Sequence, residues 1–461
     1  MKKDDIDTLD RWYQCDISRE EIKALMQRSD LKGLAHTAVF FGVLIGLGIL
    51  AYRAIGTPWM IPAFFAYGTI YCFLNHLMHE THHRTVFKSV WLNELVHWIS
   101  GFAHGAEPIY DRWGHAQHHT YTYLIGDDPE VITPRPADIP TLLGQFFGIG
   151  IIQPGPIINH AFGIIPPADK ELVPESDWKS MIWSSRLWVL GYALIIASCF
   201  VLGTILPLVY TLFARFYGAF IPTLLNDTQH VGLEQNVFDH RLICRNVWVD
   251  PVTSFFYWNM QYHTEHHMFP TVPFHALHKL NKQIAHQLPP MYPSVWHAYS
   301  EMIPTILRQQ KDHEYHVTPQ VPDDYPAAPK ASRIPDLGKT ETASENEKCQ
   351  PAAARTGTSV WISVPDAKDM PMDDVLEFQH NGEQYAVYRL DDGYHAMSNK
   401  CSHAGAKLSK GFVIDGQIEC PAHNGRFDIR TGEATLSPAC DKMRTFPVRI
   451  QNGEVQLGLL C

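Results

Sequence analysis

Three short stretches decide how the larger part of this chain folds: HETHH at residues 79–83, HAQHH at 115–119 and HTEHH at 263–267. Each has histidines at positions i, i+3 and i+4, a spacing that places imidazoles on one face of a helix. Groups of imidazoles that converge in this way are typical of metal sites. Imidazole binds Fe, Zn, Cu and Ni, so the ligand type alone leaves the metal open.

The number of these histidines indicates two metal ions rather than one. A single ion cannot use all eight candidate ligands, which are His79, His83, His115, His118, His119, His263, His266 and His267. The alternative interpretation is a set of surface or helix-end histidines. That interpretation holds for most single histidines, but it does not account for the repeated spacing.

Apolar blocks flank the histidine stretches and predict a membrane protein. Residues 34–52 and 58–74 form two apolar runs, and residues 187–225 form a longer block with Gly203 and Pro207 near its middle. A spanning helix needs about 20 apolar residues, so the third block is long enough for two spans that turn near Gly203–Pro207. We therefore expect four spans. Buried core helices of a large soluble protein are the alternative.

The distribution of basic residues predicts the orientation of these spans. No signal peptide is visible, and the polar residues 1–33 carry seven Lys or Arg, whereas the turn at 51–58 carries only Arg53. The N-terminus is therefore expected in the cytoplasm, and four spans then place all three histidine stretches on the cytoplasmic side. Residues 145–165 are apolar but interrupted by Gly and Pro, so we expect them to be interfacial or re-entrant.

Charge and cysteine content exclude two classes of protein. The net charge is −11 and no basic footprint for phosphates is evident, so we expect no nucleic-acid partner. The 9 cysteines are odd in number and scattered, which argues against a secreted disulfide scaffold.

The C-terminal quarter has a different texture. Residues 317–357 lack hydrophobic periodicity and are rich in Pro, Ala, Ser and charge, as in a flexible linker. From residue 358 onward, β-branched and aromatic residues alternate around turn pairs, which predicts a small all-β domain of hairpins. The turns are Asn381–Gly382, Asp391–Asp392–Gly393, Asp415–Gly416 and Asn452–Gly453.

Two cysteine–histidine pairs lie within this predicted β domain. Cys401 and His403 are followed by Cys420 and His423, so two loops each offer one thiolate and one imidazole. This set fits a [2Fe–2S] centre with two Cys on one iron and two His on the other. A zinc site could use the same four ligands.

The histidine half resembles the membrane fatty-acid desaturase and hydroxylase superfamily over residues 34–290, through HETHHRTVF (79–87), HAQHHTYTYLIGDDPE (115–130) and WNMQYHTEHHMFPTVPFHAL (258–277). The resemblance implies four transmembrane helices beneath a cytoplasmic cap, a diiron centre and O2-dependent attack on unactivated C–H bonds. It also implies a further ligand in an Asn-x-x-x-His context, which adds His230. Asn226 is then expected to act on the iron through water.

Two further features lie near the predicted ligands, an acidic run at residues 127–130 and the additional histidine His82. The run at residues 127–130 could orient the ligating histidines, or its carboxylates could cap helices in a loop. His82 stands where the superfamily has a residue that is not a ligand.

The C-terminal quarter resembles the Rieske ferredoxins that serve bacterial oxygenases, through KCSHAGAKLSKG (400–411) and IECPAHNGRFDIRTGEATLSPA (418–439). The resemblance implies that Cys401, His403, Cys420 and His423 hold the cluster. High-potential Rieske proteins carry a disulfide and hydroxyl groups near the cluster, but here those positions are Ala406, Ala422, Gly425 and Phe427. Fewer hydrogen bonds to the sulfurs predict a potential toward the lower end of the Rieske range.

We therefore predict a multidomain protein: a cytoplasmic segment 1–33, an all-α four-span membrane domain 34–316 with a histidine-rich cytoplasmic cap, a linker 317–357 and an all-β Rieske domain 358–461. Its expected function is O2-dependent desaturation or hydroxylation of a lipid acyl or other alkyl chain at a diiron centre. The fused Rieske domain would supply the electrons, and an NAD(P)H-dependent reductase would supply that domain.

Two alternatives remain open from the sequence. One is a monooxygenase or demethylase of a small alkyl or amine substrate. The other is a non-catalytic membrane protein that transfers electrons or handles metals.

Overall fold

The chain divides into two compact units, a helical unit over Trp12–Ala328 and a unit that contains the C-terminal strands. The computed structural model describes residues 11–131, 133–150, 154–327, 359–403, 405–422, 424–439 and 441–460. From residue 328 onward the predicted linker 317–357 lies outside the described residues. The four domain boundaries stay predictions.

Two helices of the helical unit are long and apolar enough to cross a bilayer, judged by length and composition over the described residues. These are α3 (Asp30–Ala54) and α11 (Glu175–Leu202). Ser29 caps the start of α3 by accepting the backbone N–H of Lys32. Gly203 ends α11 with a φ of 64°, which confirms the turn predicted near Gly203–Pro207.

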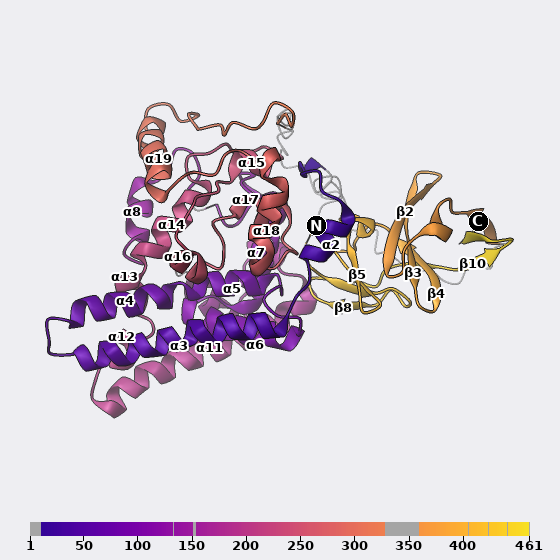
Figure 1. Ribbon diagram of the computed structural model, residues 1–461. Coiled ribbons are helices and arrows are strands. Elements are labelled where there is room, and N and C mark those ends of the chain that lie inside the picture. The colour runs from indigo at the N-terminus through magenta and orange to yellow at the C-terminus, as the bar shows by residue number, and fades with distance from the viewer. Residues whose placement is uncertain are drawn as a thin grey trace. The chain divides into compact units, whose positions relative to one another are not determined.

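The other two predicted spans are not confirmed as uninterrupted helices. The run 58–74 forms α4 (Met60–Cys72), which lies antiparallel to α3 (Figure 1) and continues through Phe73 into α5 (Leu74–His82). The region after Gly203 is divided into α12 (Leu206–Val209), α13 (Ala214–Gly218) and α14 (Phe220–His230). Hydropathy located these segments, but it does not register the turns that divide them.

Helices α4 and α13 approach each other closely. A Cβ atom on Gly218 would overlap the backbone of Gly68, so the two helices can touch only because both residues lack side chains. This contact fixes α13 against the helix that leads into the first histidine stretch.

Shorter helices form the rest of the helical unit, and Figure 1 shows α15, α17 and α18 grouped together on one side of α3 and α5. Their bounds are α2 (Arg19–Leu25), α6 (Val90–His104), α7 (Pro108–Tyr121), α8 (Ile139–Gln145), α9 (Pro154–Ala161), α10 (Pro167–Leu172), α15 (His240–Ile243), α16 (Pro251–Phe256), α17 (His263–Met268), α18 (Phe274–Ile284) and α19 (Val295–Gln309). Residues 151–153, within the segment predicted to be interfacial or re-entrant, lie outside the described residues, and that prediction stays untested.

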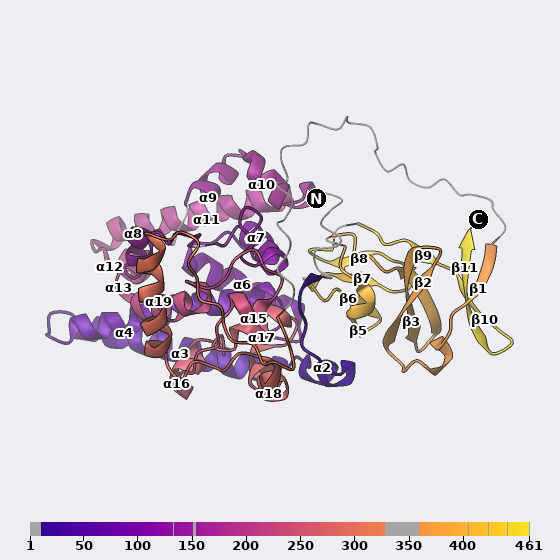
Figure 2. The same cartoon turned by 90° about the horizontal axis from the view of Figure 1, so that it is seen from above.

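The strands of the other unit form three antiparallel sheets, which Figure 2 shows one after another. The sheet orders are β1-β11-β10, β2-β3-β4-β9 and β5-β6-β7-β8. The bounds are β1 (Ser359–Ser363), β2 (Asp374–His380), β3 (Glu383–Leu390), β4 (Gly393–Ser398), β5 (Phe412–Ile414), β6 (Gln417–Glu419), β7 (Arg426–Asp428), β8 (Ala434–Leu436), β9 (Thr445–Phe446), β10 (Val448–Gln451) and β11 (Glu454–Leu460).

The predicted turn pairs join these strands. Asn381–Gly382 connects β2 to β3 with φ angles of 50° and 80°, and Asp415–Gly416 connects β5 to β6 with 51° and 75°. Asn452–Gly453 connects β10 to β11. Two residues with positive φ give the turn a twist that matches the right-handed twist of the flanking strands. The described strands and these turns confirm the prediction of a β domain built from hairpins.

Candidate metal centres

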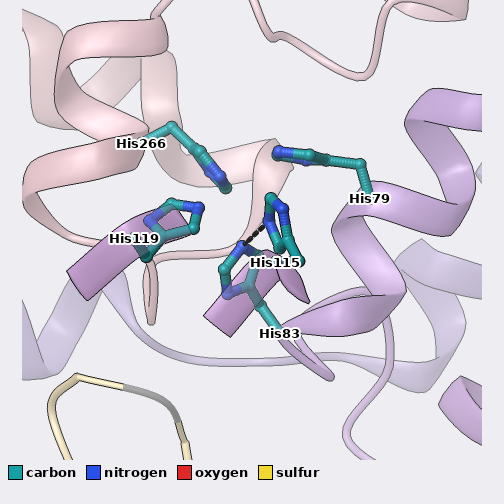
Figure 3. Close-up of side chains that lie close together, drawn as sticks. All are labelled: His79, His83, His115, His119 and His266. Carbon is teal, nitrogen blue, oxygen red and sulfur yellow. Dashed lines mark hydrogen bonds between the residues drawn. The ribbon is translucent and has the colours of Figure 1, made fainter. Parts of the chain in front are cut away.

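Five histidines from three separate stretches of chain form the first group (Figure 3). The ligand atoms of all five lie within 4.8 Å of one another, and they belong to His79, His83, His115, His119 and His266. Helix α5 and its C-cap supply two, α7 supplies two and α17 supplies one. The i, i+4 spacing on α5 and on α7 therefore brings each pair to one face, as the sequence predicts.

Two imidazoles of this group, those of His119 and His266, have nitrogens that make no hydrogen bond within the described part of the chain. The Nε2 atoms of His119 and His266 are buried and make no hydrogen bond to any described residue. The Nε2 atoms of His83 and His115 face each other at 3.0 Å. A buried polar atom without a partner costs about 1–3 kcal/mol, so this arrangement fits a bound metal ion, which would accept these lone pairs.

A second group lies beside the first. It consists of His230 at the end of α14, His263 and His267 on α17, and Cys244, which directly follows α15. The Nε2 atom of His263 lies 2.8 Å from that of His230 and 3.0 Å from that of His267. Three imidazole nitrogens therefore converge on one point, as metal ligands do.

Cys244 is the residue that sequence reasoning missed. Its Sγ atom lies 3.8 Å from Nδ1 of His230, whereas His230 turns its Nε2 atom toward His263. Its neighbour at i−4 in the sequence is His240, which is not part of the second group, so local spacing did not single out Cys244 as a ligand. Only the position of α15 against α17 brings it here.

His118 lies next to the second group but is not part of it by ligand-atom distance. Its ring centroid is 4.9 Å from that of His267 and 5.6 Å from that of His230. Its Nδ1 atom is 2.9 Å from Oδ2 of Asp128. Among the nine predicted iron ligands, eight fall in the two groups and His118 lies beside them, so its role as a ligand remains a prediction.

The acidic run at residues 127–130 contacts two of these histidines. Asp128 pairs with His118, and Oε1 of Glu130 lies 3.2 Å from Nδ1 of His115. The backbone carbonyl of Ile243 lies 2.7 Å from Nδ1 of His230. Partners of this kind fix the tautomer and ring orientation of a ligating histidine.

The electrostatic environment suits metal binding. Burial lowers the pKa of His79, His119 and His266 well below the usual value, and it does the same for the pKa of His263 and His267. These imidazoles are therefore neutral near pH 7, which is the form that binds metals. For His118, burial alone would lower the pKa, but the Asp128 carboxylate outweighs it and raises the pKa to about 9.

Two polar residues near the groups have protein partners of their own. The Nε2 atom of His82 lies 2.6 Å from Oδ2 of Asp111, outside both groups. Oδ1 of Asn226 lies 2.8 Å from Nε2 of His76, one turn of α14 before His230. The role predicted for Asn226, through water, stays a prediction.

Three of the four predicted cluster ligands in the other unit lie in the described residues, in loops that follow strands. Cys401 and His403 follow β4, and Cys420 follows β6. Cys401 and Cys420 are 4% and 1% exposed and belong to one buried core cluster. His423 lies outside the described residues. Two thiolates brought together in this way fit a [2Fe–2S] cluster, and the ligand set as a whole stays a prediction.

Comparison with known families supports these interpretations. The family model described as "Fatty acid desaturase" matches residues 27–299, which is more than half of the chain. The model described as "Rieske [2Fe-2S] domain" matches residues 360–447.

Individual relatives match the C-terminal unit. The ferredoxin component of the naphthalene 1,2-dioxygenase/salicylate 5-hydroxylase systems from Ralstonia sp is 39% identical over 102 residues, which cover 22% of this chain and 98% of that protein. The anthranilate 1,2-dioxygenase ferredoxin subunit from Burkholderia cepacia is 45% identical over 74 residues, 16% of this chain and 68% of that protein. The solved ferredoxin of carbazole 1,9a-dioxygenase from Nocardioides aromaticivorans IC177 is 34% identical, with a TM-score of 0.20, covering 22% of this chain and 96% of its own.

The matched families and the described residues together indicate two kinds of metal centre in this protein. Desaturase-family membership together with the two histidine groups indicates a diiron centre, and the Rieske domain indicates a [2Fe–2S] cluster. The chain therefore belongs to the fatty acid desaturase family and carries a Rieske [2Fe–2S] domain at its C-terminal side.

Proposed function

We propose that this protein is a membrane-bound, O2-dependent oxidoreductase that desaturates or hydroxylates a lipid acyl or other alkyl chain. The observation that carries the proposal is the position of α17, whose three histidines contribute to both metal groups. His266 belongs to the first group, and His263 and His267 belong to the second. One short helix thus holds two adjacent sites at a fixed separation, as a centre with two irons requires.

When bound, the two irons activate O2 for attack on an unactivated C–H bond, and the [2Fe–2S] cluster carries electrons one at a time. The protein's own residues hold the ligand imidazoles in position and exclude water from the metal site. The ligand histidines of both groups other than His79 are nine-tenths or more buried, so bulk water is kept from the site. Asp128 and Glu130 hold the rings of His118 and His115 from behind.

The electron requirement links the two domains. Hydroxylation and desaturation with O2 each take two electrons from outside the substrate, together with two protons. A Rieske domain on the same chain can deliver them in two single-electron steps after an NAD(P)H-dependent reductase has reduced it. A tether of about 40 residues keeps the donor at an effective concentration around millimolar.

The membrane assignment is also part of the proposal. Helices α3 and α11 expose large apolar side chains, for example Ile45, Phe200 and Val201, which are 61%, 83% and 84% exposed. Side chains of this kind suit a lipid environment. We propose that α4 and the divided segment from α12 to the first turns of α14 complete four crossings, with the histidine groups and the Rieske domain in the cytoplasm.

The test is O2 consumption by the purified full-length protein with NAD(P)H and a reductase, combined with mass spectrometry of lipids and small metabolites from cells with and without the protein. A product that differs from its precursor by two hydrogens or one oxygen supports the proposal. A small alkyl or amine product would instead identify the monooxygenase or demethylase alternative. No substrate-stimulated O2 consumption in iron-loaded protein would favour the non-catalytic alternative.

A further inference from the structure

Cys244 is a buried cysteine that the sequence motifs do not include. Its side chain is 2% exposed, and its ligand atom and those of His230, His263 and His267 all lie within 4.8 Å of one another. Sulfur and imidazole nitrogen bind a first-row metal at about 2.3 Å and about 2.1 Å, so two such ligands of one ion are at most about 4.4 Å apart. The group is therefore close to the size that one ion can span. An inert buried thiol is the ordinary interpretation of such a residue, so its surroundings have to decide.

Hydrogen bonds at the back of two imidazoles fix where their lone pairs point. Nδ1 of His230 lies 2.7 Å from the carbonyl oxygen of Ile243, so it donates its proton there. Nδ1 of His267 lies 3.2 Å from Oγ1 of Thr122, whose own hydroxyl donates to the carbonyl oxygen of His118 at 2.8 Å. This hydroxyl therefore accepts from His267. A neutral imidazole carries one N–H, so the Nε2 atoms of both rings are bare acceptors.

Both bare acceptors face the third histidine of the group. Nε2 of His263 lies 2.8 Å from Nε2 of His230 and 3.0 Å from Nε2 of His267. A neutral His263 can donate one proton to at most one of these two lone pairs. Its Nδ1 atom is also buried and makes no hydrogen bond within the described part of the chain. A cation at this point would accept all three lone pairs, and this observation does not depend on the cysteine.

The residues after Cys244 hold it between the two helices that supply these histidines. The backbone N–H of Arg245 donates to the carbonyl oxygen of Gln229 at 2.9 Å, directly before the histidine of α14. Oδ1 of Asn246 accepts the backbone N–H of Thr264 at 3.0 Å, directly after the first histidine of α17. The position of the sulfur relative to both helices is therefore fixed by backbone hydrogen bonds on either side.

The one printed polar contact of the sulfur is not a working hydrogen bond. Sγ lies 3.8 Å from Nδ1 of His230, but that nitrogen already gives its proton to Ile243, so it cannot accept the S–H. Burial raises the pKa of the Cys244 thiol well above its usual value. A metal that binds Sγ therefore has to displace the thiol proton, as it does at other cysteine sites.

We propose that Cys244 binds one of the two metal ions through Sγ, together with His230, His263 and His267. On binding, the metal–sulfur bond forms, the S–H bond breaks and the proton leaves to water. The two sites then differ, because the first group offers only imidazole nitrogens and the second adds a thiolate. This inference goes beyond the proposed function, since it holds whichever reaction the protein performs.

The test is X-ray absorption at the cobalt edge. The iron of the helical unit is removed from the purified full-length protein with a chelator and replaced with Co(II). The cobalt edge reports only the neighbours of cobalt, so the irons and thiolates of the Rieske cluster do not contribute. We expect a cobalt–sulfur shell at about 2.3 Å, with about one sulfur for every two cobalt ions, beside the shell of imidazole nitrogens.

Variants assign the sulfur to a residue. Cys244→Ser should lose the cobalt–sulfur shell and keep the nitrogen shell, and Cys244→Ala should do the same without an added hydroxyl. The matched control is Cys15→Ser. Cys15 is also buried, and its backbone N–H lies 3.2 Å from Sδ of Met268 at the end of α17, but it belongs to neither group. This control should keep the full cobalt–sulfur shell.

The wild type decides the question even where a variant fails to fold. Two bound cobalt ions with nitrogen and oxygen neighbours alone would show that Cys244 is an inert thiol. An equal cobalt–sulfur shell in Cys244→Ser would assign the sulfur to another residue. Absence of cobalt from the helical unit would overturn this inference together with the diiron assignment. A cobalt–sulfur shell in a protein whose iron form shows no substrate-stimulated O2 consumption would support this inference and count against the proposed function alone.

Discussion

The Nδ1 atom of His118 lies 2.9 Å from Oδ2 of Asp128, and both side chains are almost fully buried. The backbone holds Asp128 in turn, because Oδ2 accepts the N–H of Tyr123 and Oδ1 accepts that of Glu130, both at 2.8 Å. The His118 ring is thus fixed from behind with Nε2 directed away from the carboxylate. Because the pKa of His118 is raised to about 9, a metal that binds Nε2 would have to displace a proton, and the carboxylate fixes the ring in the orientation that such binding needs.

Asp128→Asn should weaken iron binding or turnover by about 10- to 100-fold, the usual effect of removing a carboxylate behind a ligating histidine. The amide keeps the shape of the side chain but removes its charge. Iron per chain and O2 consumption measure the effect. The matched control is Asp127→Asn, which removes the same charge from the exposed neighbour and should leave both quantities near wild type. Equal behaviour of the two variants would mean that Asp128 only stabilises its loop.

His266→Ala should abolish turnover and leave the Rieske EPR signal intact. His266 is 1% exposed and lies in the first histidine group, so its loss removes one ligand and opens a cavity in that group. Turnover is measured as substrate-stimulated O2 consumption, and the EPR signal is recorded after reduction with dithionite.

The control for this variant is His297→Ala. His297 lies at the exposed start of α19, away from both groups, and should keep full activity. Persistent turnover in His266→Ala would show that the ligand assignment is wrong.

The histidine groups could be predicted because local spacing carried the information. On α7, positions 115 and 119 are one helical turn apart, so any helix at that place brings them to one face. The hairpins of the β unit were predictable for a similar reason, since pairs such as Asn381–Gly382 adopt positive φ almost wherever they occur between strands. In both cases a few neighbouring residues determine the local structure.

Other features depend on contacts between distant segments, which the sequence does not show. Cys244 reaches the second group only through the packing of α15 on α17. The prediction of an uninterrupted fourth spanning helix was not confirmed, because hydropathy counts apolar residues and does not detect where α13 ends and α14 begins. The hydrogen bond from Nη2 of Arg215 to the carbonyl oxygen of His104 likewise joins two residues that are more than a hundred positions apart in the chain.

The iron content of the purified protein should be about four atoms per chain with about two acid-labile sulfides, two irons from each centre. Cys420→Ser should lower the iron content to about two atoms per chain and remove the Rieske EPR signal. Cys420 and Cys401 are the two buried cysteines of one hydrophobic core in this unit, and Cys420 is a predicted ligand of the [2Fe–2S] cluster. Metal analysis by mass spectrometry and a sulfide assay measure both values. Zinc in the helical unit of fully active protein would contradict the diiron assignment.

The two cofactors should also be separable by function. Without the cluster, Cys420→Ser should lose O2 consumption driven by NAD(P)H and reductase, while the iron that remains should still be chelatable from the helical unit. Full NAD(P)H-driven activity in this variant would mean that electrons reach the diiron centre by a route that does not involve the Rieske domain.

Phe427→Tyr should raise the reduction potential of the Rieske cluster by about 40 mV, the equivalent of one hydrogen bond of roughly 1 kcal/mol in a one-electron couple. Phe427 is 0% exposed on β7 and shares a core cluster with Cys401 and Cys420, so a hydroxyl added to its ring enters the surroundings of the cluster. Gly425 is less suitable, because a Cβ atom there would lie 2.7 Å from the backbone nitrogen of Ala439. Spectroelectrochemical titration measures the potential. The matched control is Phe446→Tyr, which adds the same hydroxyl beside a hydrophobic core that contains neither Cys401 nor Cys420. This variant should leave the reduction potential unchanged. Equal shifts in both variants would assign the effect to general polarity rather than to a hydrogen bond at the iron–sulfur centre.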